Sequence, residues 1–152
     1  MVNHLLRLFP RLQAGNFRVT SPPDREYNCI AWAAGDTHIW WWPTGDPRKT
    51  HWPTAAPRLL TLAAFRDAFA SLGYSVCESE ELEPNFEKVA LFTDLPNGIP
   101  THAARQLPNG RWTSKLGYSE DIEHELRDVE GTIYGTAVLF MKRPRPLPLG
   151  QS

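Results

Sequence analysis

Cysteine is scarce in this sequence, so a disulfide framework is excluded as the source of its stability. Only two cysteines occur among 152 residues, whereas small disulfide-stabilised domains usually carry about four or more. An excess of charge of one sign is also missing, because 16 basic residues nearly balance 17 acidic residues. A protein that binds nucleic acid mainly through its phosphates needs a basic excess, so we expect no nucleic-acid partner.

Long hydrophobic runs are missing as well. No run approaches the ~18 apolar residues that cross a membrane, and the first residues lack the basic and long apolar regions of a signal peptide. Together with the two free thiols, these features favour a cytoplasmic protein with no membrane partner. At ~100–200 residues per domain, we expect one domain over residues 1–143, followed by a proline-rich flexible tail over residues 144–152.

Proline and tryptophan are abundant by contrast, with 14 and 6 residues. Four of the tryptophans fall within residues 36–57, which also contain several prolines and glycines; they are Trp40, Trp41, Trp42 and Trp52. We expect a long ordered loop here, because these aromatic side chains need apolar surface to bury. Long loops without secondary structure of their own are often functional.

Hydrophobic periodicity and capping residues predict the regular elements. A short apolar helix over residues 27–35 has Asn28 or Asp24 as its N-cap and Gly35 as its end. Thr61 and Gly73 enclose an amphipathic helix. A third helix is expected over 120–129, and strands over 74–77, 88–93, 101–107, 111–116 and 134–141. This order predicts an α+β fold, with helices packed on a mostly antiparallel sheet.

One arrangement of residues suggests chemistry. Cys29 lies at the start of the short apolar helix, and His102 at the start of a strand. A thiol is a good nucleophile as the thiolate, and the unpaired N–H groups at a helix start lower its pKa. An imidazole nearby takes the proton. We therefore expect Cys29 to attack a carbonyl, and His102 to act as general base and then as general acid.

A third group is expected to orient the imidazole of His102. A two-residue turn at Asn109-Gly110 places Gln106 and Lys115 on the face of His102, whereas a shift of one residue places Ser114 there instead. Gln106 lies on this face in either register. Gln106, Ser114 and Lys115 therefore stay as alternatives for this role, and Asp121 and His124, which follow shortly after, are groups that could fold back toward it.

Short segments around these residues resemble known families. Asn28–Ala33, Thr101–Ala104 and Gly110–Ser114 resemble papain-like cysteine hydrolases of the NlpC and CHAP type. That resemblance implies a papain-like fold with Cys29 and His102 in catalysis, and with Ser114 where most of those enzymes have His, Asn, Asp or Gln. About residues 24–143 also resemble an uncharacterised bacterial domain family with YNCIAWA, PTHAARQ, WTSKLG and DIEH segments.

Two main hypotheses follow. The first is a thiol hydrolase of peptides or other amide-containing substrates, without metal or other cofactor; a toxin-like effector that uses the same pair of residues is a variant of it. Its candidate substrate-binding residues are Asn28, Trp32, Trp41, Trp42 and Lys115. The second hypothesis is a non-catalytic binding or interaction domain whose tryptophan-rich loop meets a protein partner. No metal is expected, because the cysteines and histidines lack the spacing of zinc ligands.

Overall fold

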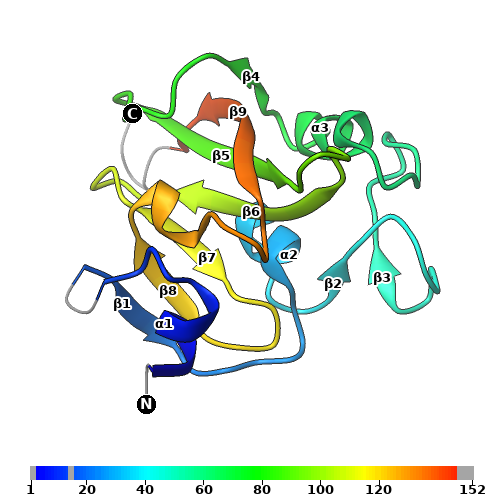
Figure 1. Cartoon of the computed structure of the whole chain (residues 1–152). Coiled ribbons are helices and arrows are strands. Elements are labelled where there is room, and N and C mark those ends of the chain that lie inside the picture. The colour runs from blue at the N-terminus through cyan, green and yellow to red at the C-terminus, as the bar shows by residue number, and fades with distance from the viewer. Residues whose placement is uncertain (1–2, 14–15, 147–152) are drawn as a thin grey trace.

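A seven-stranded antiparallel sheet dominates the protein in the computed structural model, which describes residues 3–13 and 16–146 (Figure 1). Its strands follow the order β1-β8-β7-β6-β5-β9-β4. Their bounds are β1 Arg18–Ser21, β4 Ser75–Cys77, β5 Phe86–Thr93, β6 Pro100–Gln106, β7 Trp112–Lys115, β8 Asp121–His124 and β9 Thr136–Pro144. A separate parallel pair lies in the tryptophan-rich loop and consists of β2 Trp40–Trp41 and β3 Thr50–His51.

The helices are few and short. They are α1 Asn3–Leu8, α2 Cys29–Ala34, α3 Leu62–Ala70 and one 3-10 helix, η1 Leu126–Val129. The two capping residues predicted for α2 and α3 are confirmed, because Asn28 accepts a hydrogen bond from the Ala31 N–H and Thr61 accepts one from the Ala64 N–H. Gly35 ends α2 in the left-handed conformation, with a φ of 89°, as glycine does after many helices.

The predicted α+β fold with a papain-like arrangement is wrong, because strands and not helices make up most of the regular structure. The α-helices have only 6, 6 and 9 residues. Residues 120–129, which we expected as a third helix, form β8 and η1. Asp121 and His124 are fully buried there, and β8 hydrogen-bonds to β7 on one side and β1 on the other. Pairing with these strands outweighs the helical pattern of the segment.

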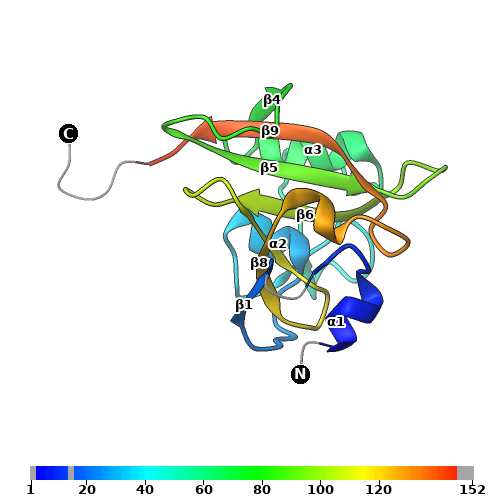
Figure 2. The same ribbon diagram turned by 60° about the vertical axis from the view of Figure 1, so that its left-hand side comes forward.

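Strands β5 and β6 are buried on both faces, which explains the continuous apolar run of β5. Val89 and Leu91 belong to a core that includes α2 and α3, whereas Ala90 and Phe92 belong to a second core that includes α1. Figure 2 shows the β1–β8 end of the sheet turned strongly against its β5–β9 end, as the twist of strands requires. The site described below lies beside β6, between these two cores.

The β6–β7 hairpin has a different register from that of a two-residue turn. The Leu107 N–H donates to the Arg111 carbonyl, so three residues form the loop, and Gly110 takes a φ of 89°. Such loops combine an ordinary turn with a left-handed residue. Arg105 therefore lies opposite Thr113, and the face of β7 that carries Ser114 is also the face that carries His102.

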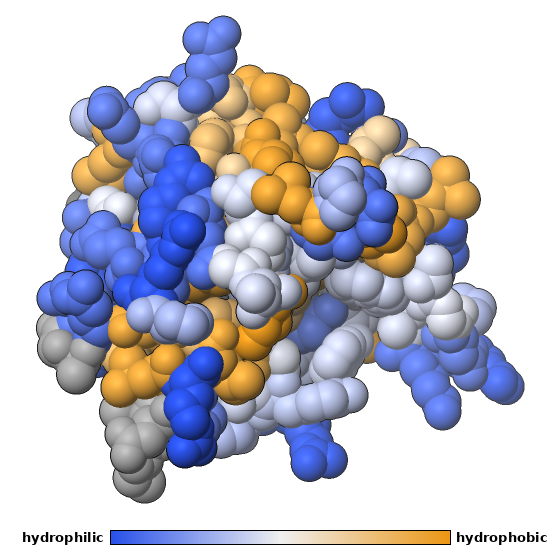
Figure 3. Space-filling view, in the orientation of Figure 1, coloured by the Kyte–Doolittle hydropathy of each residue, from blue (hydrophilic) through white to orange (hydrophobic). Residues whose placement is uncertain are grey.

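The structure describes only the beginning of the predicted proline-rich tail. Strand β9 ends at Pro144, and residues 147–152, most of the predicted tail, lie outside the described residues. Within the described ranges, no helix is long and apolar enough to cross a membrane. Figure 3 shows hydrophobic patches on one face of the molecule that are interrupted by hydrophilic residues.

Candidate active site

Cys29 is the first residue of α2, and Asn28 fixes the position of this helix end. Asn28 Oδ1 accepts hydrogen bonds from the N–H groups of Ala31 and Trp41, at 3.1 and 3.0 Å. Asn28 Nδ2 donates to the Trp41 carbonyl at 2.9 Å. The amide of Asn28 is thus engaged in joining α2 to β2, and its place beside Cys29 follows from this structural role.

The side chain of Cys29 borders a cavity of about 290 Å³ that is partly open to solvent. Strands β6 and β7 hydrogen-bond only near the hairpin, at residues 105–106 and 112–113. The cavity lies where their other ends separate, since Thr101 and Gly117 are both in its wall. Trp40, Trp42 and Tyr134 contribute aromatic surface to the same wall.

Burial raises the pKa of the Cys29 thiol to about 11. The backbone N–H groups of Ala103 and Ile30 lie beside the sulfur and lower the pKa, but the loss of hydration has the larger effect. The thiol is therefore protonated at neutral pH, contrary to the lowered pKa that the helix start led us to expect. Attack by Cys29 consequently requires a base that removes its proton.

Three buried side chains from successive strands form a hydrogen-bonded chain. His102 Nε2 on β6 lies 2.9 Å from Ser114 Oγ on β7, and Ser114 Oγ lies 2.7 Å from His124 Nε2 on β8. His124 Nδ1 lies 2.7 Å from the Glu125 carbonyl oxygen. His102 is 1% exposed, and Ser114 and His124 are completely buried, so no bulk water competes for these bonds.

The partners in this chain determine where its protons lie. A carbonyl oxygen only accepts, so His124 Nδ1 carries the proton and its Nε2 accepts from the Ser114 hydroxyl. Ser114 Oγ then accepts from His102, whose proton must lie on Nε2. His102 Nδ1 therefore presents its lone pair, and this buried atom has no hydrogen-bond partner among the described residues. A buried acceptor without a partner is rare and costly.

Both histidines are neutral at pH 7. Burial lowers the pKa of His124 to about 4, and burial together with repulsion from His124 holds the pKa of His102 well below its usual range. His102 also stacks on the ring of Tyr134 at 3.9 Å between centroids, and Tyr134 lines the cavity with Cys29. The sulfur of Cys29 lies beside the N–H of Ala103, the residue after His102, without a hydrogen bond to Nδ1 itself.

The site residues predicted from the sequence separate into two groups. His102 and Ser114 are hydrogen-bonded to each other, and Cys29 lies beside the backbone N–H of Ala103, the residue after His102. Asn28 and Trp42 lie with Cys29 in the cavity wall. His124, which the sequence offered only as a group that could fold back toward this face, joins His102 and Ser114 because the register of β7 and β8 brings it to Ser114. The only trace of this in the sequence is the alternation in the DIEH segment, which puts Ile122 and His124 on one face.

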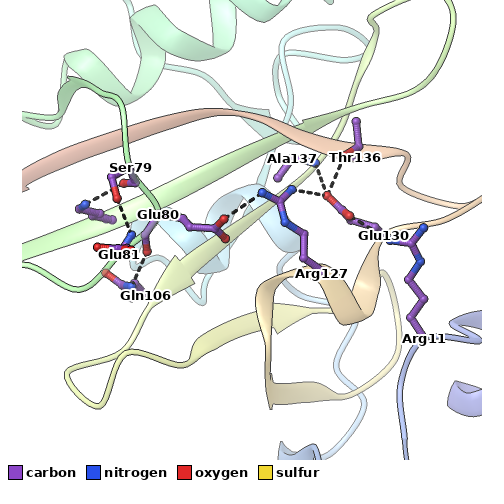
Figure 4. A network of polar contacts seen from close by, with 10 residues as sticks. Arg11, Ser79, Glu80, Glu81, Gln106, Arg127, Glu130, Thr136 and Ala137 are labelled. Atoms are coloured by element: carbon purple, nitrogen blue, oxygen red, sulfur yellow. Dashed lines mark hydrogen bonds and ion pairs between the residues drawn. The ribbon is translucent and has the colours of Figure 1, made fainter.

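The remaining predicted residues are engaged elsewhere. Gln106 Nε2 donates to the Glu80 carbonyl, in a polar network at the far end of β6 (Figure 4). Lys115 Nζ is buried and donates to the carbonyls of Gly117 and Ser119. Trp32 Nε1 donates to Thr113 Oγ1, and Trp41 Nε1 donates to Asp36 Oδ2. Each of these groups holds two segments of the fold together.

A larger cavity, of about 610 Å³, lies near Glu130, but its buried carboxylate is already satisfied. Arg11, Arg127 and Thr136 donate to it at 3.1, 2.7 and 2.7 Å, and the Ala137 N–H donates at 3.0 Å (Figure 4). No cluster of His, Cys, Asp or Glu in the described part of the chain is arranged to hold a metal ion. Of these two cavities, the smaller one has a thiol in its wall.

The lowered pKa values of the buried histidines make stability depend on pH. Between pH 6.5 and 5 the unfolded chain binds protons at these positions and the folded chain does not, so the free energy of unfolding falls as the pH falls. We expect a loss of about 1–2 kcal/mol over this range from His124. Urea unfolding at pH 7 and pH 5 measures it. The free energy of unfolding of the His124→Leu variant should fall less between these pH values. An equal fall in both proteins would contradict the lowered pKa of His124.

Comparison with known proteins finds a family match and nothing closer. Residues 18–142 match a family described as a domain of unknown function, DUF7689. No curated protein and no solved structure matches the chain. The match agrees with the resemblance to an uncharacterised domain family, whereas the papain-like resemblance gains no support from these comparisons.

Proposed function

The chain belongs to the DUF7689 family, whose function is unknown, and we propose that it is a thiol-dependent hydrolase of amides or esters that uses Cys29 and His102. One observation carries this proposal: the basic Nδ1 of His102 is buried and has no partner among the described residues. Hydrogen bonds on the other side of the ring fix this tautomer. A thiol lies beside the next residue of the same strand, at the wall of a cavity.

The reaction starts from a neutral pair, because Cys29 is protonated and His102 is uncharged at pH 7. His102 Nδ1 takes the thiol proton as Cys29 Sγ forms a bond to the substrate carbonyl carbon. The imidazolium then gives this proton to the departing nitrogen or oxygen, and the bond to that atom breaks. This leaves a thioester between Cys29 and the acyl group.

Water completes the cycle. His102 Nδ1 removes a proton from water as the water oxygen attacks the thioester, and the proton then passes to the sulfur, so a carboxylic acid leaves and the thiol is restored. Ser114 and His124 keep the His102 proton on Nε2, and they stabilise the imidazolium as it forms. The N–H groups of Ala103 and Ile30 beside the sulfur are donors for the negative charge that develops there.

The thioester is the test of this function. After brief exposure of the protein to p-nitrophenyl acetate, mass spectrometry should find one added acetyl group on the peptide that contains Cys29. The adduct should disappear with time as p-nitrophenol release continues. The chain offers a matched comparison, since Cys77 is also a free and partly buried cysteine.

Two variants complete this experiment. Cys77→Ser should form and hydrolyse the adduct like the natural protein, whereas Cys29→Ser should release p-nitrophenol no faster than buffer. Acetylation of Cys77 alone, or an adduct on Cys29 that persists after the ester is consumed, would contradict the proposal.

A second candidate is a non-catalytic binding domain. It is favoured by the raised pKa of Cys29 and by the missing hydrogen bond between its sulfur and His102. In such a domain Cys29 packs as a small apolar residue, and the tryptophan-rich loop binds a partner. This candidate predicts that p-nitrophenyl acetate leaves Cys29 of the folded protein unmodified.

A further inference from the structure

The cavity at Cys29 has an unusual wall for a site that would bind a peptide backbone. Its surface is overwhelmingly apolar, and it includes Trp40, Trp42 and the ring of Tyr134. No Lys, Arg, Asp or Glu belongs to this wall as the described residues form it. The few polar side chains of this wall are already hydrogen-bonded within the protein. Asn28 forms hydrogen bonds with α2 and β2, and the Thr101 hydroxyl donates to the Tyr134 carbonyl.

We propose that this cavity selects substrates whose acyl part is an uncharged, apolar group, either an aliphatic chain or an aromatic ring, next to the carbonyl that Cys29 attacks. The inference rests on the proposed function for its chemistry, and it adds the class of substrate. A carboxylate or ammonium in such a cavity would lose its hydration without gaining a partner of opposite charge.

The size of the cavity sets the size of the group. Its volume of about 290 Å³ is roughly twice that of the ~150 Å³ apolar cavity that holds one benzene molecule in an engineered lysozyme. A phenylpropanoyl group or an acyl chain of about six carbons therefore fits, and an acetyl group leaves most of the space empty. Each buried methylene contributes a factor of about three to four in binding.

The rim supports the same class of ligand. Trp40, in the cavity wall, lies against Tyr118 with 5.1 Å between ring centroids, and Tyr118 is 59% exposed. The guanidinium of Arg25 lies 5.4 Å from the Tyr118 ring centre. Apolar surface thus continues from the cavity to the outside of the molecule. The ammonium of Lys115 lies behind the wall and is already bonded to the carbonyls of Gly117 and Ser119.

The first measurement does not depend on hydrolysis. We compare the rates at which iodoacetamide and N-hexyl iodoacetamide alkylate Cys29 in the folded protein, with Cys77 as the internal reference. The hexyl reagent should modify Cys29 at least about tenfold faster, and should show no such preference at Cys77. Thr50→Phe, which adds a ring in the cavity wall, should reduce the preference to within about threefold. Leu59→Phe, at an exposed position, should retain it.

The second measurement follows turnover of p-nitrophenyl esters. Hexanoate and 3-phenylpropanoate should exceed acetate in kcat/KM by about a hundredfold, and the adipate monoester, which ends in a carboxylate, should resemble acetate. A preference for only one of the two apolar esters would show whether the acyl group that the cavity selects is an aliphatic chain or an aromatic ring. Equal alkylation by both reagents, or none in the folded protein, would overturn the inference. A clear hexyl preference without turnover would leave the cavity assignment standing and refute the hydrolase proposal.

Discussion

Replacing His102 by glutamine is expected to lower kcat/KM at pH 7 by about a thousandfold. The reason is the protonation state of the nucleophile, because a thiol with a pKa of about 11 is ionised in roughly one molecule in ten thousand at pH 7. General-base catalysis typically contributes a factor of about 10²–10⁴. Glutamine retains an N–H donor for Ser114 but has no basic nitrogen, so the substitution removes the base with little change of packing.

The pH dependence of the same variant separates the loss of a base from general damage to the fold. In the natural protein, His102 is neutral throughout pH 6.5–9 because its pKa is held well below its usual range, and kcat/KM should be nearly constant there. In the His102→Gln variant only the thiolate reacts, so kcat/KM should rise about tenfold per pH unit until the pH approaches the pKa of Cys29.

The control for this experiment is His38→Gln, which changes an exposed histidine in the tryptophan-rich loop and should leave the profile flat. A profile for His102→Gln that is parallel to that of the natural protein would show that His102 does not remove the thiol proton. The lower rate of the variant would then come from damage to the fold and not from the loss of a base.

The elements that sequence analysis predicted well are those with local causes. Helix α3 follows from its apolar stripe and the Thr61 cap, and α2 follows from Asn28 and Gly35. The hairpin of β6 and β7 was also predicted, but its register depends on whether Gly110 is the second or the third residue of the loop. Only the structure decides this, with φ at 89° for Gly110, and the decision brings Ser114 rather than Lys115 to His102.

The fold class was predicted wrongly because it depends on pairings between distant segments. Strand β1 pairs with β8, which lies about a hundred residues further along the sequence, and β4 pairs with β9. No local sequence pattern predicts either pairing. The papain-like resemblance rests on three short segments, which form a helix start and two strand segments as expected. Segments of this size do not specify the order of the sheet to which they belong.

The candidate site was predicted in part for the same reason. Cys29 and His102 could be singled out because a thiol at a helix start and an imidazole at a strand start are together the groups that thiol acyl transfer needs. Burial of the thiol reversed the expected direction of its pKa, since the surrounding core removes water and this loss outweighs the effect of the N–H groups beside the sulfur. His124 could not be assigned, because its role exists only through Ser114 on a neighbouring strand.

Ser114→Ala is expected to lower the free energy of unfolding by about 2–4 kcal/mol. The hydroxyl of Ser114 accepts from His102 Nε2 and donates to His124 Nε2, and all three groups are buried. The alanine variant leaves a donor and an acceptor without partners, and each unsatisfied buried group costs about 1–3 kcal/mol. Urea unfolding at pH 7.5 measures the loss. Thr113→Val, at the preceding position and on the opposite face, loses one hydrogen bond with Trp32 and should cost about 1 kcal/mol.

A double variant distinguishes the structural from the positioning role of the hydrogen-bonded side chains of His102, Ser114 and His124. Adding His124→Leu to Ser114→Ala removes one of the two unsatisfied groups, so about 1 kcal/mol of stability should return, as when both partners of a buried hydrogen bond are replaced. Hydrolysis should not return with it, because nothing then holds the His102 proton on Nε2, and part of the imidazole population presents N–H to the thiol. A kcat that recovers together with stability would show that Ser114 and His124 serve packing alone.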